Sequence, residues 1–212
     1  MEFQNYTAHL FDWVTFTLIG LIFVYGLFHY FGVLNAKNNI AAVLSSEFPS
    51  ATESSFLVNF LLNINTLVVL ALFVFTGLQF INPNVDSSFI LFLRIIFGFL
   101  VLFGVQRLIN YMHSGMTKTT SFFTNYLSIQ NQFAHLAAVC ALPLLIISLY
   151  SNGLNYEALI AGATVFGGIY LFGLLKSIAS SNRMIGPQKF HLIFYLCGNE
   201  ILPFFLFYKI LI

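Results

Sequence analysis

Long apolar stretches occupy most of this chain, and only short polar connections separate them. An α-helix needs roughly 20 apolar residues, at a rise of about 1.5 Å each, to cross a bilayer. The stretches here have that length. We therefore predict an all-α, polytopic membrane helix bundle with six transmembrane spans, near residues 13–34, 56–80, 89–111, 132–150, 156–179 and 190–212.

The overall composition supports this class of protein. Of the 212 residues, 59% are hydrophobic and 7% are charged, whereas a soluble domain carries about 25% charged residues. So little charge cannot cover a surface that faces water, and we expect a lipid bilayer as the surrounding partner. The net charge of +1, without a basic stripe, argues against a nucleic-acid partner. The start of the chain lacks the basic region of a signal peptide, so we expect one transmembrane helical domain over residues 1–212.

The basic residues predict the orientation in the membrane. Three longer connections on one side of a six-span chain contain Lys37, Lys118 and Arg183. Cytoplasmic loops carry an excess of Lys and Arg, so both termini are predicted to lie outside. Residues 36–50 and 119–130 are amphipathic, which fits either short helices on the inner leaflet or a docking surface for a partner.

The last apolar stretch contains an acidic residue, Glu200, next to Asn199. A carboxylate at membrane depth costs several kcal/mol unless it is paired or solvated. Arg94, just inside the third span, is the partner we expect for it. Such a pair can either fix how the helices pack or carry a proton, an ion or a substrate.

Other polar residues extend this candidate intramembrane cluster. Asn63 belongs to a polar stripe of the second span, and His135 shares a helical face with Asn131 at the start of the fourth. Amide bonds between helices explain such residues as well as a water-lined path does. In the fifth span, small residues at intervals of four predict close helix packing. They are the pairs Ala158–Gly162 and Ala163–Gly167, which Gly168 follows.

Motifs for catalysis or for a cofactor are not evident. The sequence contains no Gly-x-Ser-x-Gly, no phosphate-binding loop and no close pair of acidic residues. Its histidines and cysteines lack the spacing of a metal site. We therefore expect no enzyme activity, no cofactor and no metal.

The C-terminal third carries a resemblance to a known family. Its residues are Phe190-His191-Leu192-Ile193-Phe194-Tyr195-Leu196-Cys197, followed by Glu200-Ile201-Leu202-Pro203, with a weaker echo in Asn131 and Leu142-Pro143-Leu144-Leu145. In these residues the chain resembles a family of Bacteroidota inner-membrane proteins defined as a domain of unknown function. Gly198-Asn199 stand where the family pattern has small or apolar residues. The resemblance implies a multi-pass protein of a bacterial inner membrane, and it implies no activity.

Two functions fit these observations. The first is a non-enzymatic structural or accessory subunit of a larger envelope complex, such as protein export or secretion machinery, with other membrane subunits as partners. The second is a small transporter or channel that uses the cluster around Glu200 and Arg94. Six spans without a detectable inverted repeat are few for a transporter, so the subunit is the preferred hypothesis.

Overall fold

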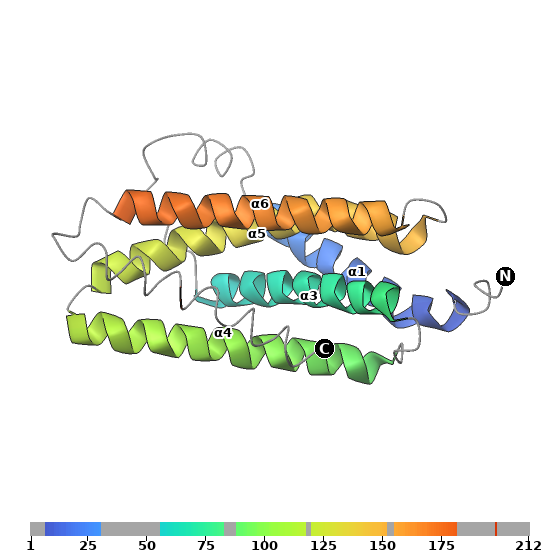
Figure 1. Ribbon diagram of the computed structural model, residues 1–212, viewed down its shortest axis with the longest axis horizontal. Helices are drawn as coiled ribbons and strands as arrows, with labels where there is room; N and C mark the ends of the chain where they lie inside the picture. Colours follow the sequence, from blue (N-terminus) through green and yellow to red (C-terminus); the bar gives the residue numbers. More distant parts are fainter. Residues whose placement is uncertain are drawn as a thin grey trace. The chain divides into compact units, whose positions relative to one another are not determined.

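The computed structural model describes residues 7–30, 56–82, 88–117, 120–151, 155–181 and 198 (Figure 1). These residues are all-α and form five helices, which are α1 (Thr7–Tyr30), α3 (Phe56–Ile81), α4 (Phe89–Thr117), α5 (Thr120–Tyr150) and α6 (Asn155–Ser181). Four of them, α3 to α6, are long and apolar enough to cross a membrane, and α1 contains the shorter apolar segment Trp13–Phe28. Apart from Gly198, the predicted span at 190–212 lies outside the described residues, as do both termini, so six spans with the termini outside remain a prediction.

Local hydrogen bonds explain where α3 ends and where α4 begins. The Asn82 amide donates to the Leu78 carbonyl at 2.9 Å, and Pro83, which has no N–H to continue the helix, follows in the sequence. At the start of α4, the Ser88 hydroxyl oxygen accepts a hydrogen bond from the Leu91 amide at 3.3 Å. A serine in this position satisfies an amide that the first helical turn leaves without a partner.

The chain divides into two compact units, residues 1–93 and 94–212. In the first unit, an aromatic cluster surrounds Trp13 of α1. The centroid of its ring lies 5.2 Å from that of Phe75, 5.3 Å from that of Phe89 and 5.0 Å from that of Phe92. Edge-to-face and tilted rings at this separation attract one another beyond the contact area they share. The cluster therefore links α1 with the end of α3 and the first turn of α4.

In the second unit, α5 and α6 run side by side and pack along their length (Figure 1). Small side chains of α5 make this possible, because Ala137, Ala138 and Ala141 are completely buried. Small residues let membrane helices approach closely. Among the described glycines, Gly173 of α6 has the tightest surroundings, because a Cβ atom there would lie 2.3 Å from the Cβ atom of Phe133.

The start of α5 differs from the sequence prediction. We expected the span to begin near Gln132, after a separate amphipathic segment at 119–130, whereas α5 is continuous from Thr120. Tyr126, Ile129 and Phe133 follow one another at helical intervals, and all three are fully buried. The apolar face of the segment therefore continues the packed face of the span. The other amphipathic segment, 36–50, lies outside the described residues.

Candidate functional site

Polar side chains in the second unit connect α5 to both of its neighbours. We define the polar cluster as Arg107 of α4, Gln130, Asn131 and His135 of α5, and Tyr170 of α6. Buried polar groups in a membrane protein need partners from the protein, because lipid offers none. The contacts of these residues therefore show how the three helices are held at this level.

Arg107 and Asn131 join α4 to α5. A terminal guanidinium nitrogen of Arg107 donates to the Asn131 side-chain oxygen at 2.5 Å. His135 lies one helical turn further along α5, is only 6% exposed, and is within electrostatic range of Arg107. A hydrogen bond with a charged donor is about twice as strong as a neutral one, so this contact fixes the orientation of the guanidinium.

Gln130 and Tyr170 join α5 to α6. The Gln130 amide nitrogen donates to the Tyr170 hydroxyl at 2.7 Å, and the Tyr170 ring stacks on Phe166 at 6.3 Å. Close by, the Lys176 ammonium lies 6.0 Å from the centre of the Phe133 ring, which is within the range of a cation–π contact. The α5–α6 pair is thus bound by polar as well as apolar contacts on this face.

The polar cluster lies within the helices and not at their ends. Arg107 precedes the end of α4 at Thr117 by ten residues, and Asn131 follows the start of α5 at Thr120 by eleven. At a rise of about 1.5 Å per residue, these separations are about 15 Å and about 16 Å along the helix axes.

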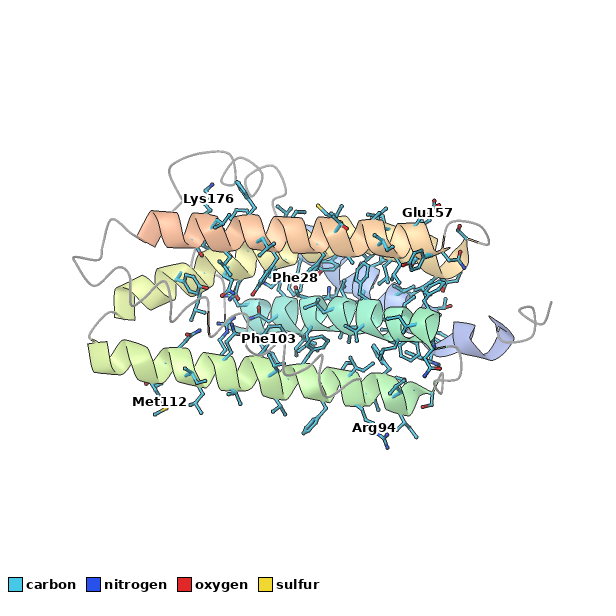
Figure 2. All side chains as sticks on the ribbon, in the orientation of Figure 1. Phe28, Arg94, Phe103, Met112, Glu157 and Lys176 are labelled. Carbon is cyan, nitrogen blue, oxygen red and sulfur yellow. The ribbon has the colours of Figure 1, made fainter. Side chains whose placement is uncertain are left out.

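The cluster is rich in hydrogen-bond donors and positive charge. Arg107 contributes a cation and five N–H donors, and the amides of Gln130 and Asn131 contribute more. Among the described residues of the second unit, the only acidic residue is Glu157, at the opposite end of α6 from Lys176 (Figure 2). The described residues contain no group of three or more His, Cys, Asp or Glu side chains placed to hold a metal.

The structure brings one of the predicted polar residues into this cluster. His135 belongs to it, whereas Asn63 is half-buried on α3 in the first unit. Arg94 lies at the opposite end of α4 from Met112, and its side chain is exposed (Figure 2). Glu200 and Asn199 lie outside the described residues, so their predicted pairing with Arg94 stays a prediction.

The predicted packing residues of α6 have different surroundings. Gly162 is buried, Gly167 is half-buried, and Ala163 and Gly168 are exposed. A Cβ atom added at Gly167 or Gly168 would meet no atom within 4 Å. Their role in packing therefore remains a prediction, and the tight contact seen in α6 is at Gly173.

Sequence reasoning missed Arg107 as the partner of Asn131, and it missed Gln106 and Asn110 as members of the buried face of α4. We had used Arg107 only as a charge that sets the orientation in the membrane. Gln106 and Asn110 are buried, at 7% and 1% exposure, and they continue the buried face of α4. The available signal was spacing: this face runs through Phe92, Ile95, Phe99, Gln106 and Asn110.

A second buried polar group lies in the first unit. The Tyr25 hydroxyl of α1 lies beside the side chains of Asn65 and Thr66 of α3. Within the described part of the chain, neither the Tyr25 oxygen nor the Asn65 side-chain nitrogen completes a hydrogen bond. The Thr66 hydroxyl donates to the Leu62 carbonyl of its own helix, at 3.0 Å.

This arrangement predicts the sign of a stability change. Tyr25→Phe removes a buried hydroxyl that gains no hydrogen bond, so the free energy of unfolding in detergent should rise by about 1 kcal/mol. Phe23→Leu in the same helix is the control, because that ring is 64% exposed and its replacement should change the free energy of unfolding by less than about 0.5 kcal/mol. A loss of stability in Tyr25→Phe alone would show that the hydroxyl has a bound partner such as water.

Taken together, the apolar helices define a multi-pass, all-α membrane protein. The chain belongs to the family described as a domain of unknown function (DUF4271), which matches residues 13–211. No curated protein and no solved structure matches it. A domain of unknown function is what the resemblance implied, and the family assigns no activity.

Proposed function

We propose that this protein is a non-catalytic subunit of a larger complex in a bacterial inner membrane, such as protein export or secretion machinery. The proposal rests on one surface, the exposed face of α6. Only 22% of the most apolar part of the span Asn155–Ser177 is buried within the chain, against 56% for the span Asn59–Ile81. The remainder of α6 must meet either lipid or another protein.

The side chains on this exposed face favour a protein. Ala161, Thr164 and Gly168 are exposed and lie on one side of α6, at intervals of three and four residues. Small residues in membrane helices are concentrated where helices touch, because they let the backbones approach. The exposed face of α4 is different, since it carries the bulky side chains Leu100, Val105 and Leu108.

Crosslinking in native membranes tests this assignment. A photo-crosslinking amino acid at Gly168 should give protein adducts, because we expect a helix of another subunit there. The same group at Gly104 is the matched control: this glycine is also exposed with no atom within 4 Å, but its neighbours are bulky. We expect lipid adducts at Gly104. Mass spectrometry of the Gly168 adduct would identify the partner.

Two outcomes would overturn the proposal. Lipid adducts alone at both positions would mean that the small face of α6 meets the bilayer. An adduct between two copies of the chain, without a further protein, would point to a homo-oligomer instead. Because both labelled positions are exposed, neither label should disturb folding.

A small transporter or channel is the second candidate. The observation in its favour is the polar cluster, since polar side chains inside a membrane often line the path of a solute or an ion. Purified protein in liposomes should then show ion or solute flux that Arg107→Gln abolishes. The absence of flux for a broad panel of ions and small solutes would leave the subunit as the better explanation.

A further inference from the structure

We propose that residues 190–212 of this chain pack on an exposed side of α5, where the side-chain amide of Asn199 donates a hydrogen bond to the main-chain carbonyl of Val139. This goes beyond the role of a subunit, because it gives an occupant to a surface that the proposed partner at α6 does not use. The proposal rests on the exposed side of α5, the proline within it, the open surface at Gly198 and the extent of the second unit.

One side of α5 is buried in the first half of the helix and exposed in the second. Four residues at intervals of seven share this side, because seven residues make about two helical turns; they are Tyr126, Phe133, Cys140 and Ile147. Tyr126 and Phe133 are fully buried, whereas Cys140 is exposed and Ile147 is 42% exposed. The side of α5 that packs on α6 near Phe133 therefore continues as a surface that is open to another helix.

Pro143 makes this exposed side chemically different from an ordinary apolar face. The residue lies inside α5 and is exposed, and it has no N–H to donate to the carbonyl four residues earlier, which is that of Val139. Val139 is itself 40% exposed. A neighbouring helix can supply the donor that a proline takes away, and lipid cannot. We therefore expect the helix that covers this side to bring a hydrogen-bond donor to Val139.

Residues 190–212 offer such a donor beside an open surface. Gly198, the residue that the structure describes there, has a helical backbone and is exposed, and a Cβ atom on it would meet nothing within 4 Å. A glycine lets the backbone of a second helix approach closely. The next residue is Asn199, whose side-chain amide has two N–H groups. A close approach of α5 at Gly198 therefore brings a donor next to the helix that needs one.

The extent of the second unit favours an occupant from within the chain. Residues 190–212 belong to this unit, which covers residues 94–212 and includes α5 and α6. The family match likewise extends to residue 211, so the stretch is part of the domain that the family shares. It is predominantly apolar, which suits contact with the exposed side chain of Ile147. The small face of α6 then stays available for another subunit.

Photo-crosslinking of the purified full-length chain in lipid nanodiscs tests the placement. A photo-crosslinking amino acid at Ile147 should form an adduct with a peptide from residues 190–212, at the mass of one chain. The same group at Gly104 is the control, because this exposed glycine of α4 has no atom within 4 Å and should give lipid adducts. Proteolysis followed by mass spectrometry identifies both kinds of adduct.

Two results at Ile147 would overturn the placement. An adduct at the mass of two chains would assign this side of α5 to a second copy, and lipid adducts alone would assign it to the bilayer. No other protein is present in the nanodisc, so the result does not depend on the partner proposed at Gly168.

A double-mutant cycle tests the hydrogen bond itself. Asn199→Leu should lower the equilibrium constant for folding in detergent about fivefold, the effect of one ordinary hydrogen bond. In a Pro143→Ala background the same change should have little effect, because alanine supplies an N–H to the Val139 carbonyl. Pro83→Ala is the control background, since this proline lies in the first unit, and Asn199→Leu should keep its full effect there. An effect that is absent from the wild-type chain, or equal in the Pro143 and Pro83 backgrounds, would exclude the hydrogen bond.

Discussion

Replacing Gly173 with alanine is expected to destabilise the protein, and replacing Gly167 with alanine in the same helix is expected to stabilise it. An alanine Cβ at Gly173 would lie 2.3 Å from the Phe133 Cβ and 2.5 Å from its Cγ, whereas at Gly167 it would meet nothing within 4 Å. Alanine favours a helix over glycine by about 1 kcal/mol. At Gly167 we expect the free energy of unfolding to rise by this amount, because no clash opposes it.

At Gly173 the clash exceeds the gain. The nearest atom is the Cβ of Phe133, which stays in place in every side-chain rotamer, so relief requires the backbones of α5 and α6 to separate. Separation would loosen the contacts of Ala137 and Ala141, which are fully buried. Overpacking of this kind costs about 1–3 kcal/mol. After the helix-propensity gain of about 1 kcal/mol is subtracted, we expect a net loss of about 1 kcal/mol.

Unfolding in detergent, followed by helix content as denaturant is added, measures both changes. The contrast in sign between two identical substitutions in one helix is the decisive feature. Equal effects at Gly173 and Gly167 would mean that α5 and α6 are further apart than the structure shows. A fall in stability at Gly167 alone would place the tight contact at the position that the spacing of small residues predicted.

This case also shows how far the sequence could lead. Intervals of four between small residues predicted close packing of the fifth span, and α6 does pack closely on α5. The position of the contact was not predictable, because it depends on which glycine faces Phe133 when the two helices meet. The alignment of α5 along α6 depends on both helices together, and the sequence of either helix alone does not determine it.

The class of protein followed directly from the sequence, since long apolar stretches and little charge leave few alternatives. The boundaries were less certain, as α5 shows: polar residues at 119–130 suggested a separate segment, but its apolar side continues the buried face that begins with Tyr126. Hydropathy averages over all sides of a helix. It therefore misses a span whose first turns are polar on one side and buried on the other.

The candidate site was predicted only in part, for a related reason. His135 was chosen because it shares a helical face with Asn131. Spacing along a single helix is enough to predict that relation. The bond from Arg107 to Asn131 joins two helices, and spacing along the chain does not reveal it. On α3, Asn63 was chosen and Asn65 is the buried amide. Residues two positions apart lie about 200° apart around the helix axis. A small error in predicting which face is buried therefore selects the wrong asparagine.

Replacing Trp13 with alanine is expected to cause the largest loss of stability in the first unit. Its ring contacts Phe75, Phe89 and Phe92, with centroids 5.0 to 5.3 Å apart, and the last two rings also lie 6.2 Å from each other. Each aromatic pair contributes about 0.5–1.5 kcal/mol beyond its contact area. Loss of a fully buried large ring costs about 3–5 kcal/mol in soluble proteins. Trp13 is half-buried, so the lower end of that range applies to it.

The loss of stability expected for Trp13→Ala is smaller in a membrane protein, and a second aromatic residue of α1 serves as the control. Lipid is as apolar as the side chains, so packing rather than transfer from water holds these rings together, and we expect a loss of about 3 kcal/mol. Phe16→Ala removes a ring of the same helix that is 75% exposed and should cost less than about 1 kcal/mol. Unfolding in detergent distinguishes the two. Similar losses for both variants would mean that Trp13 only anchors the helix at the membrane surface, as interfacial tryptophans often do, and that its three ring contacts do not hold the unit together.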